Sequence, residues 1–149
     1  MNFKKIYSMK RVNFSQVFVW AFPLNFLLAS HFFSSQNQND PWIAPPEADA
    51  VLNPYNGNAK ATEKGKILYE KLCWQCHGMT GNGDGPGAAV LDPKPANYSL
   101  PEVQKQSDGA LVWKISTGRG TMPAFKTNLS LNERWMLVNY IRKLGKTTP

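Results

Sequence analysis

The chain has 149 residues, of which 42% are hydrophobic, and a formal net charge of +7 at pH 7. Four of its 17 basic residues lie in the first eleven positions, and after residue 35 there are 13 basic and 10 acidic residues, a net charge of +3. This near balance excludes a typical nucleic-acid-binding domain, which concentrates positive charge. The length allows one domain.

Residues 1–35 have the order of charge and hydropathy that is typical of a secretory signal peptide. Residues 1–16 contain basic and no acidic side chains, residues 17–29 are largely apolar, and residues 30–35 are small, polar or aromatic. No small-residue cleavage triplet is present, so the segment is predicted to be either a cleaved signal or a membrane anchor through residues 17–33. In both cases the rest of the chain is predicted to lie in the periplasm or on the outer face of the cytoplasmic membrane.

Residues 36–61 are rich in Asn, Pro and Ala, which predicts an exported linker arm. The apolar side chains with which this arm can pack over the next domain are Trp42, Val51, Leu52 and Tyr55. The domain itself is predicted to cover residues 62–149. It begins with a helix, because Thr62 and Glu63 precede apolar residues at helical spacing that continue as far as Cys76.

The most informative feature of the chain is the sequence Cys73-Trp74-Gln75-Cys76-His77. It contains both cysteines of the protein and the only histidine after residue 31. This pentapeptide is the haem c attachment motif. Positions i, i+3 and i+4 of a helix share one face, so the two thiols can meet the vinyl groups along one edge of a porphyrin while the histidine ligates the iron.

Three other interpretations of this motif are weaker. A structural zinc site usually has four Cys or His ligands, and the motif supplies three. A thioredoxin-like redox pair belongs to a βαβ pattern, which is absent from the surrounding sequence. A disulfide would not require a neighbouring histidine.

A glycine-rich loop, Gly78 to Gly87, follows the motif. Alternate glycines permit tight turns and close approach of the backbone to a flat ligand. A phosphate-binding loop should instead follow a strand, and a calcium loop needs more carboxylates than Asp84 alone. The loop is therefore predicted to close the histidine side of the haem.

Two further helices have recognisable ends. Ser107 or Asp108 can cap the second helix, and Gly118 stops it. The sequence Ser130 to Glu133 is a capping box that opens the third helix, which is predicted to end at Gly145. No alternating strand pattern is present, so the fold class is predicted to be all-α.

Residues 62–145 resemble a class I c-type cytochrome of the small monohaem kind. The likeness lies in Cys73 to Gly78, the GxGDGP stretch at Gly81 to Pro86, the Gly118 to Phe125 segment, and the last helix, Arg134 to Leu144. The resemblance implies a cytochrome c-like fold, with three main helices and long irregular loops around one covalently bound haem c. It also implies that the first helix crosses the last, with Gly65 and Tyr69 against Leu137 and Tyr140, where a small residue lets two helices touch.

The candidates for the sixth iron ligand are the histidine and methionine side chains after residue 35, the part of the chain that is predicted to be exported. No second histidine is present there, and the three methionines are Met79, Met122 and Met136. Met79 is too close to His77 in sequence to reach the opposite face of the haem easily, and Met136 falls in a helix, where packing is its expected role. Met122 lies in a glycine-rich loop before Pro123, the setting in which the resembling family places its methionine ligand.

Imidazole and thioether ligation is that of electron-transfer cytochromes. With both axial positions filled, no site is open to a substrate, so the protein is expected to be no enzyme but an exported carrier of single electrons between a donor and an acceptor protein. The alternative is a dedicated haem subunit of a larger respiratory or oxidoreductase complex. A haem enzyme or gas sensor is a third possibility that requires the sixth position to be free.

The groups around the ligands are less well specified by the sequence. His77 should donate its second ring N–H to a carbonyl. In the resembling family a proline after the motif supplies this carbonyl, and Pro86 is the nearest candidate, with Pro93 and Pro95 as alternatives. The candidates for contact with a haem propionate are Tyr98, Asn97, Trp113 and Arg119.

Overall fold

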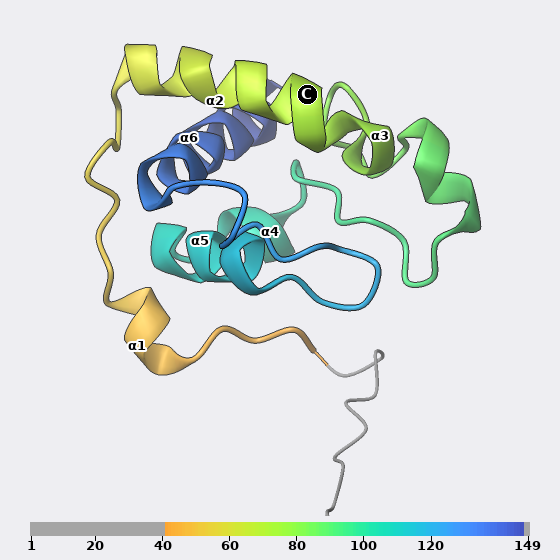
Figure 1. Ribbon diagram of the computed structural model, residues 1–149, viewed down its shortest axis with the longest axis horizontal. Helices are drawn as coiled ribbons and strands as arrows, with labels where there is room; N and C mark the ends of the chain where they lie inside the picture. The colour runs from red at the N-terminus through yellow and green to blue at the C-terminus, as the bar shows by residue number, and fades with distance from the viewer. Residues whose placement is uncertain (1–40, 148–149) are drawn as a thin grey trace, which may run out of the picture. The chain divides into compact units, whose positions relative to one another are not determined.

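The computed structural model describes residues 41–147, which belong to one compact unit. The predicted signal peptide or anchor, residues 1–35, lies outside the described residues. Within residues 41–147 all regular elements are helical, which confirms the predicted fold class, and the extended pairing is limited to an isolated bridge between Arg119 and Met122. The helices are α1 (Pro46–Asp49), α2 (Ala59–Leu72), α3 (Trp74–His77), η1 (Pro86–Val90), α4 (Pro101–Gln104), α5 (Asp108–Thr117) and α6 (Leu131–Thr147) (Figure 1).

The first long helix begins earlier than the sequence indicated and is interrupted before the second cysteine. Asn58 caps α2, because its side-chain oxygen accepts a hydrogen bond from the Ala61 N–H at 3.0 Å. The predicted start at Thr62 is therefore too late. Cys73, at φ −116°, separates α2 from α3, although its N–H still donates to the Tyr69 carbonyl at 2.9 Å.

The helices α2 and α6 cross in direct backbone contact, as the resemblance implied (Figure 1). A Cβ atom added to Gly65 would lie 1.9 Å from the carbonyl oxygen of Met136 and 3.2 Å from the nitrogen of Leu137. One turn further along α2, the fully buried ring of Tyr69 lies 5.2 Å from that of Tyr140, measured between centroids. Only a glycine at position 65 lets the backbones of α2 and α6 approach each other this closely.

The ends of α5 and the start of α6 agree with the prediction. The Ser107 hydroxyl accepts from the Ala110 N–H at 2.9 Å, and Gly118 ends α5 at φ +62°. The capping box is formed in both directions, because the Ser130 N–H donates to the Glu133 carboxylate at 2.8 Å and the Glu133 N–H donates to the Ser130 hydroxyl at 3.3 Å.

The predicted end of α6 is wrong. Gly145 lies inside the helix, which continues to Thr147. A Cβ atom at Gly145 would lie 2.3 Å from the side chain of Gln104, so this glycine makes room for α4 rather than ending α6. Gln104 in turn donates to the carbonyl of Tyr98 at 2.6 Å.

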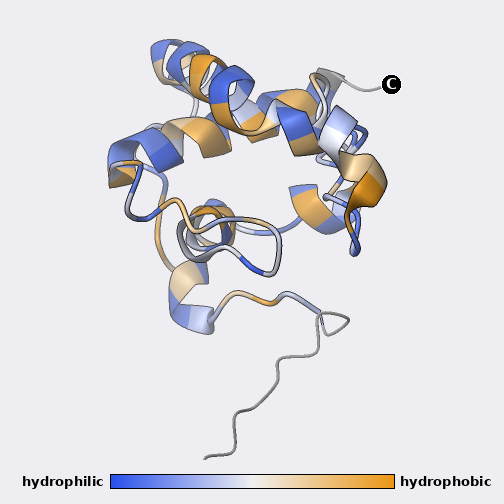
Figure 2. Ribbon diagram, turned by 45° about the vertical axis from the view of Figure 1, so that its right-hand side comes forward, coloured by the Kyte–Doolittle hydropathy of each residue, from blue (hydrophilic) through white to orange (hydrophobic). Residues whose placement is uncertain are grey.

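The core lies between α2, α5 and α6. Both long helices mix hydrophilic and hydrophobic residues along their length, as amphipathic helices do (Figure 2). Their buried side chains, with those of α5, include Tyr69, Leu111, Val112, Ile115, Trp135, Leu137, Val138, Ile141 and Leu144. Within the described part of the chain, none of the helices is long and apolar enough to cross a membrane.

Candidate haem-binding site

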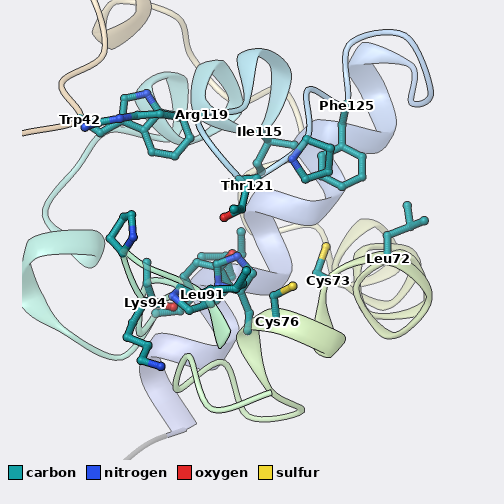
Figure 3. A pocket seen from close by; sticks show the side chains of 18 of the residues that line it. Trp42, Leu72, Cys73, Cys76, Leu91, Lys94, Ile115, Arg119, Thr121 and Phe125 are labelled. Carbon is teal, nitrogen blue, oxygen red and sulfur yellow. Dashed lines mark hydrogen bonds between the residues drawn. The ribbon is translucent and has the colours of Figure 1, made fainter. Parts of the chain in front are cut away.

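One pocket is lined by all four side chains that were predicted from the sequence to bind the haem. Cys73, Cys76, His77 and Met122 all line it, although Met122 is far from the other three in sequence. Figure 3 shows the two sulfur atoms of the cysteines close together at one side of the pocket. Thr121, the neighbour of Met122, lies across the pocket from Cys76 in this view (Figure 3).

The other walls of the pocket are mainly apolar. They contain aliphatic and aromatic side chains and three prolines, namely Leu72, Leu91, Ile115, Phe125, Leu137, Ile141, Pro93, Pro95 and Pro123. A pocket with apolar walls and a few placed polar groups suits a flat, largely hydrophobic cofactor such as a porphyrin.

The two thiols are unpaired in the structure, which gives no support to the disulfide interpretation. Burial, together with the smaller effect of the neighbouring Cys76, raises the pKa of Cys73 to about 12. A zinc site would need thiolates. The described residues also hold no group of three or more His, Cys, Asp or Glu side chains that could bind a metal ion. The thiols thus fit thioether formation with a porphyrin better than they fit zinc.

The imidazole of His77 is held in one tautomer by a backbone carbonyl. Its Nδ1 lies 3.1 Å from the carbonyl oxygen of Ala96. A carbonyl only accepts, so Nδ1 carries the proton and Nε2 keeps the lone pair that iron requires. Burial lowers the pKa of His77, and the hydrogen bond to Ala96 opposes this only in part. A neutral imidazole with a free Nε2 fits an iron ligand.

The acceptor for His77 differs from the one that the sequence indicated. Pro86 is exposed and begins η1, and neither it nor the two alternative prolines supplies the carbonyl. The loop before α4 folds back instead, because the Tyr98 N–H donates to the Gly81 carbonyl at 2.7 Å. This return brings Ala96 against the imidazole, a long-range contact that the spacing after the motif does not reveal.

Tyr98 is a residue of the site whose role the sequence did not indicate. Its ring stacks on the imidazole of His77, with centroids 4.6 Å apart and planes 16° from parallel. The sequence marked Tyr98 only as one of four candidates for a propionate contact. Of the other three, Arg119 also lines the pocket, whereas Asn97 and Trp113 are not among the lining residues.

The glycine-rich loop packs directly against α3. The Gly83 N–H donates to the His77 carbonyl at 2.9 Å, and the Gly85 N–H donates to the Cys76 carbonyl at 3.2 Å. A Cβ atom at Gly85 would lie 2.4 Å from the carbonyl oxygens of Trp74 and Gln75. These contacts satisfy the last carbonyls of α3 and hold the helix that carries the motif.

A closed turn presents Met122 to the pocket. Arg119 and Met122 exchange two backbone hydrogen bonds, each of 3.0 Å. Gly118 permits this turn, since a Cβ atom there would lie 2.5 Å from the Met122 carbonyl oxygen. Of the three methionines weighed from the sequence, Met122 lines the pocket, whereas Met79 and Met136 are not among the lining residues.

The family described as cytochrome C oxidase, cbb3-type, subunit III, matches residues 60–141. The chain belongs to this family. It is 34% identical over 101 residues to the Cbb3-type cytochrome c oxidase subunit CcoP of Azospirillum sp. (strain B510), a match that covers 63% of this chain and 32% of that protein. The chain thus spans about a third of the length of this curated relative.

Two solved structures are similar to the chain. One belongs to the Kuenenia stuttgartiensis reducing HAO-like protein complex Kustc0457/Kustc0458, with a TM-score of 0.55, 32% identity, and coverage of 64% of this chain and 48% of that one. The other is the KustC0563 c-type cytochrome, with a TM-score of 0.47, 30% identity, and coverage of 54% and 95%.

Membership in this family confirms the predicted fold and cofactor. The protein is a cytochrome c domain, and its single CxxC motif implies one covalently bound haem c. A domain of this kind is an electron carrier rather than a catalytic unit. The pocket fits this cofactor, because it presents two thiols, an imidazole of fixed tautomer, a thioether and apolar walls.

Proposed function

We propose that this protein transfers single electrons between redox proteins through haem c attached at Cys73 and Cys76, with His77 and Met122 as axial iron ligands. The observation that carries the proposal is the convergence of all four side chains on one pocket, from α3, from the residue before it and from the loop after α5. Each of the four has the chemistry that its role requires: two thiols, an imidazole and a thioether.

The bound haem supplies the one-electron chemistry. The residues of the chain position it and exclude water. His77 is oriented by the Ala96 carbonyl and by the ring of Tyr98, so its imidazole needs little movement when the charge of the site changes. The apolar walls keep solvent away and influence the reduction potential.

Export is part of the proposal. Residues 1–35 carry the pattern of a signal peptide or of an anchor through residues 17–33, and relatives of the CcoP type support a periplasmic site of action for the domain. The proposed organisation is a signal or anchor over residues 1–35, an arm that ends at the cap of α2 rather than at the expected residue 61, and the cytochrome domain from α2 onwards.

A second candidate function is that of a dedicated haem subunit in a larger respiratory or oxidoreductase complex. The relative in Azospirillum is named as an oxidase subunit, and one structural neighbour is part of a multi-protein complex. The native mass of the mature protein, measured after gentle solubilisation of cells, separates the two candidates. A carrier elutes alone, whereas a subunit elutes with its complex.

The attachment is tested by haem staining on a denaturing gel. Two thioether bonds survive denaturation, so the haem should stay with the polypeptide, and Cys73→Ala or Cys76→Ala should weaken or abolish the stain. A matured protein that carries zinc or a disulfide and no iron would overturn the proposal.

The carrier function is tested by voltammetry and ligand binding on the intact holoprotein. We expect a reversible one-electron wave and slow binding of carbon monoxide, because both axial positions are filled. Rapid binding of carbon monoxide by the unaltered protein would instead support a haem enzyme or gas sensor.

A further inference from the structure

The N-terminal arm contributes to the haem pocket although it lies outside the family match. Trp42 lines the pocket, whereas the match begins at residue 60. The ring of Trp42 packs against that of Trp113 on α5, with centroids 6.5 Å apart, and the ammonium of Lys114 lies 5.5 Å from the Trp42 ring centroid.

The arm is fixed to the domain by polar contacts along its length. The Ser107 hydroxyl donates to Asp49 at 2.6 Å. The amide of Asn53 donates to Asp108 and to Asn139, each at 2.8 Å. Because Asn139 is a buried polar residue of α6, these bonds connect the arm to the centre of the domain.

Close backbone packing supports the same conclusion. A Cβ atom at Gly109 would lie 1.8 Å from the carbonyl oxygen of Ala48, so α1 and α5 touch as closely as α2 and α6 do. Tyr55 packs against the main core, but Val51 and Leu52 are exposed, with 49% and 87% of their surface accessible. Of the four apolar side chains expected to pack, Trp42 and Tyr55 do so. This segment is thus a structural part of the domain.

Trp42 lies at the end of the pocket remote from the thiols. Figure 3 shows it beside Arg119, on the side opposite Cys73 and Cys76. In haem c the cysteines bond to the two vinyl groups, and the two propionates project from the other edge of the porphyrin. A haem attached at these cysteines therefore directs its propionate edge towards Trp42.

The charge at this end suits two carboxylates. Burial lowers the pKa of Lys114, and the positive charge of the nearby Arg119 lowers it further. The negative charge of Asp49 opposes this shift. Among residues 41–147, Lys114 and Arg119 thus bring two positive charges to this end, and anionic propionates would be attracted to them.

We propose that Trp42 covers the propionate edge of the haem, and that the arm from residue 41 to residue 58 thereby completes the pocket and keeps the reduction potential high. The indole excludes water from an edge that the family-matched segment alone leaves open. Water at this edge would stabilise ferric haem, which carries the extra positive charge, and so lower the potential.

The test compares the reduction potentials of holoprotein variants by spectroelectrochemistry. Trp42→Ala should shift the potential to more negative values, whereas Trp42→Phe, which keeps an aromatic cover, should stay near the parent. Leu52→Ala, on the same arm but exposed, is the matched control and should leave the potential unchanged. If Trp42→Ala yields too little holoprotein, Trp42→Leu should give a shift in the same direction.

Two further measurements separate this proposal from other effects. The sulfur-to-iron charge-transfer band of the ferric protein should persist in every variant, and its absence from the parent would contradict Met122 ligation, not the role of the arm. A lower unfolding midpoint with an unchanged potential in Trp42→Ala would mean that Trp42 only stabilises the arm, and would overturn the proposal.

Discussion

A thioether sulfur is a soft donor that favours ferrous over ferric iron, which is why the identity of the sixth ligand governs the reduction potential. Met122, the proposed sixth ligand, is held in place by the turn that Arg119 and Met122 close with two backbone hydrogen bonds. On the opposite side, the Ala96 carbonyl and the Tyr98 ring leave the imidazole of His77, the other proposed ligand, little rotational freedom. Both proposed ligands are therefore constrained by the protein itself, independently of the charge on the iron.

Met122→Ala should leave the haem attached but open the sixth position. We expect the reduction potential to fall by more than about 59 mV. For a one-electron couple this corresponds to a tenfold change in the equilibrium constant between ferrous and ferric haem. Carbon monoxide and cyanide should then bind readily. Met79→Ala is the matched control, since Met79 is 54% exposed, and should leave both properties unchanged. A Met122→Ala protein with the parent's potential and ferric spectrum would argue against this ligand.

At the scale of the elements, the crossing of α2 and α6 positions the motif. The contact at Gly65 brings α2 against α6, and Cys73 follows directly after the last residue of α2. The Tyr69 hydroxyl donates to the Gly78 carbonyl at 2.6 Å, which connects the crossing to the residue after the motif. Packing between two helices thus determines where the haem is attached.

Gly65→Ala should force α2 and α6 apart. The added methyl would lie 1.9 Å from a backbone oxygen that cannot move independently of α6. We expect a loss of unfolding free energy near the upper end of the ~1–3 kcal/mol typical of overpacking, measured by denaturant titration of the holoprotein. Lys64→Ala, at an exposed position of the same helix, should have little effect. Equal stability of the two variants would contradict the close crossing.

The capping box of α6 should make stability depend on pH. Hydrogen bonds from Ser130 hold the pKa of Glu133 below its usual range. Because the folded-state pKa is lowered, the contribution is fully present above the ordinary pKa of about 4.3 and is lost as the pH falls through the folded-state value. Ser130→Ala should return the pKa of Glu133 towards normal in an NMR titration, whereas Asn132→Ala should not. The stability difference between parent and Ser130→Ala should shrink in acid.

At the scale of the whole molecule, the pocket and the core share residues. Ile115, Leu137 and Ile141 belong to the buried cluster and also line the pocket. A haem in the pocket would therefore complete the hydrophobic core of the domain. A small domain depends on such a contribution, since it buries a limited fraction of its own surface.

Deletion of residues 1–35 should retain the chain in the cytoplasm and give colourless apoprotein, because the haem is attached after export. Without the cofactor the core lacks part of its packing, so we expect little helical circular dichroism and no cooperative melting. The exported full-length chain is the control. A haem-free cytoplasmic form with native helicity and cooperative unfolding would show that the domain folds independently of the haem.

Features set by short-range spacing could be predicted from the sequence. The attachment motif, the caps at Ser107 and Ser130 and the stop at Gly118 depend on residues within one helical turn of each other. The choice of Met122 over the other methionines also needed only its local setting, and it is the one that lines the pocket.

The remaining features depend on contacts between distant segments, which only the tertiary structure decides. Ala96 accepts from His77 because a loop folds back on Gly81, and Trp42 reaches the pocket because the arm is bound to α5 and α6. Gly145 resembled a helix end but makes room for Gln104. A backbone carbonyl has no sequence signature, and a glycine needed for close approach looks like one needed for a turn. Spacing along the chain therefore predicted the candidate ligands, and packing between distant segments decided their surroundings.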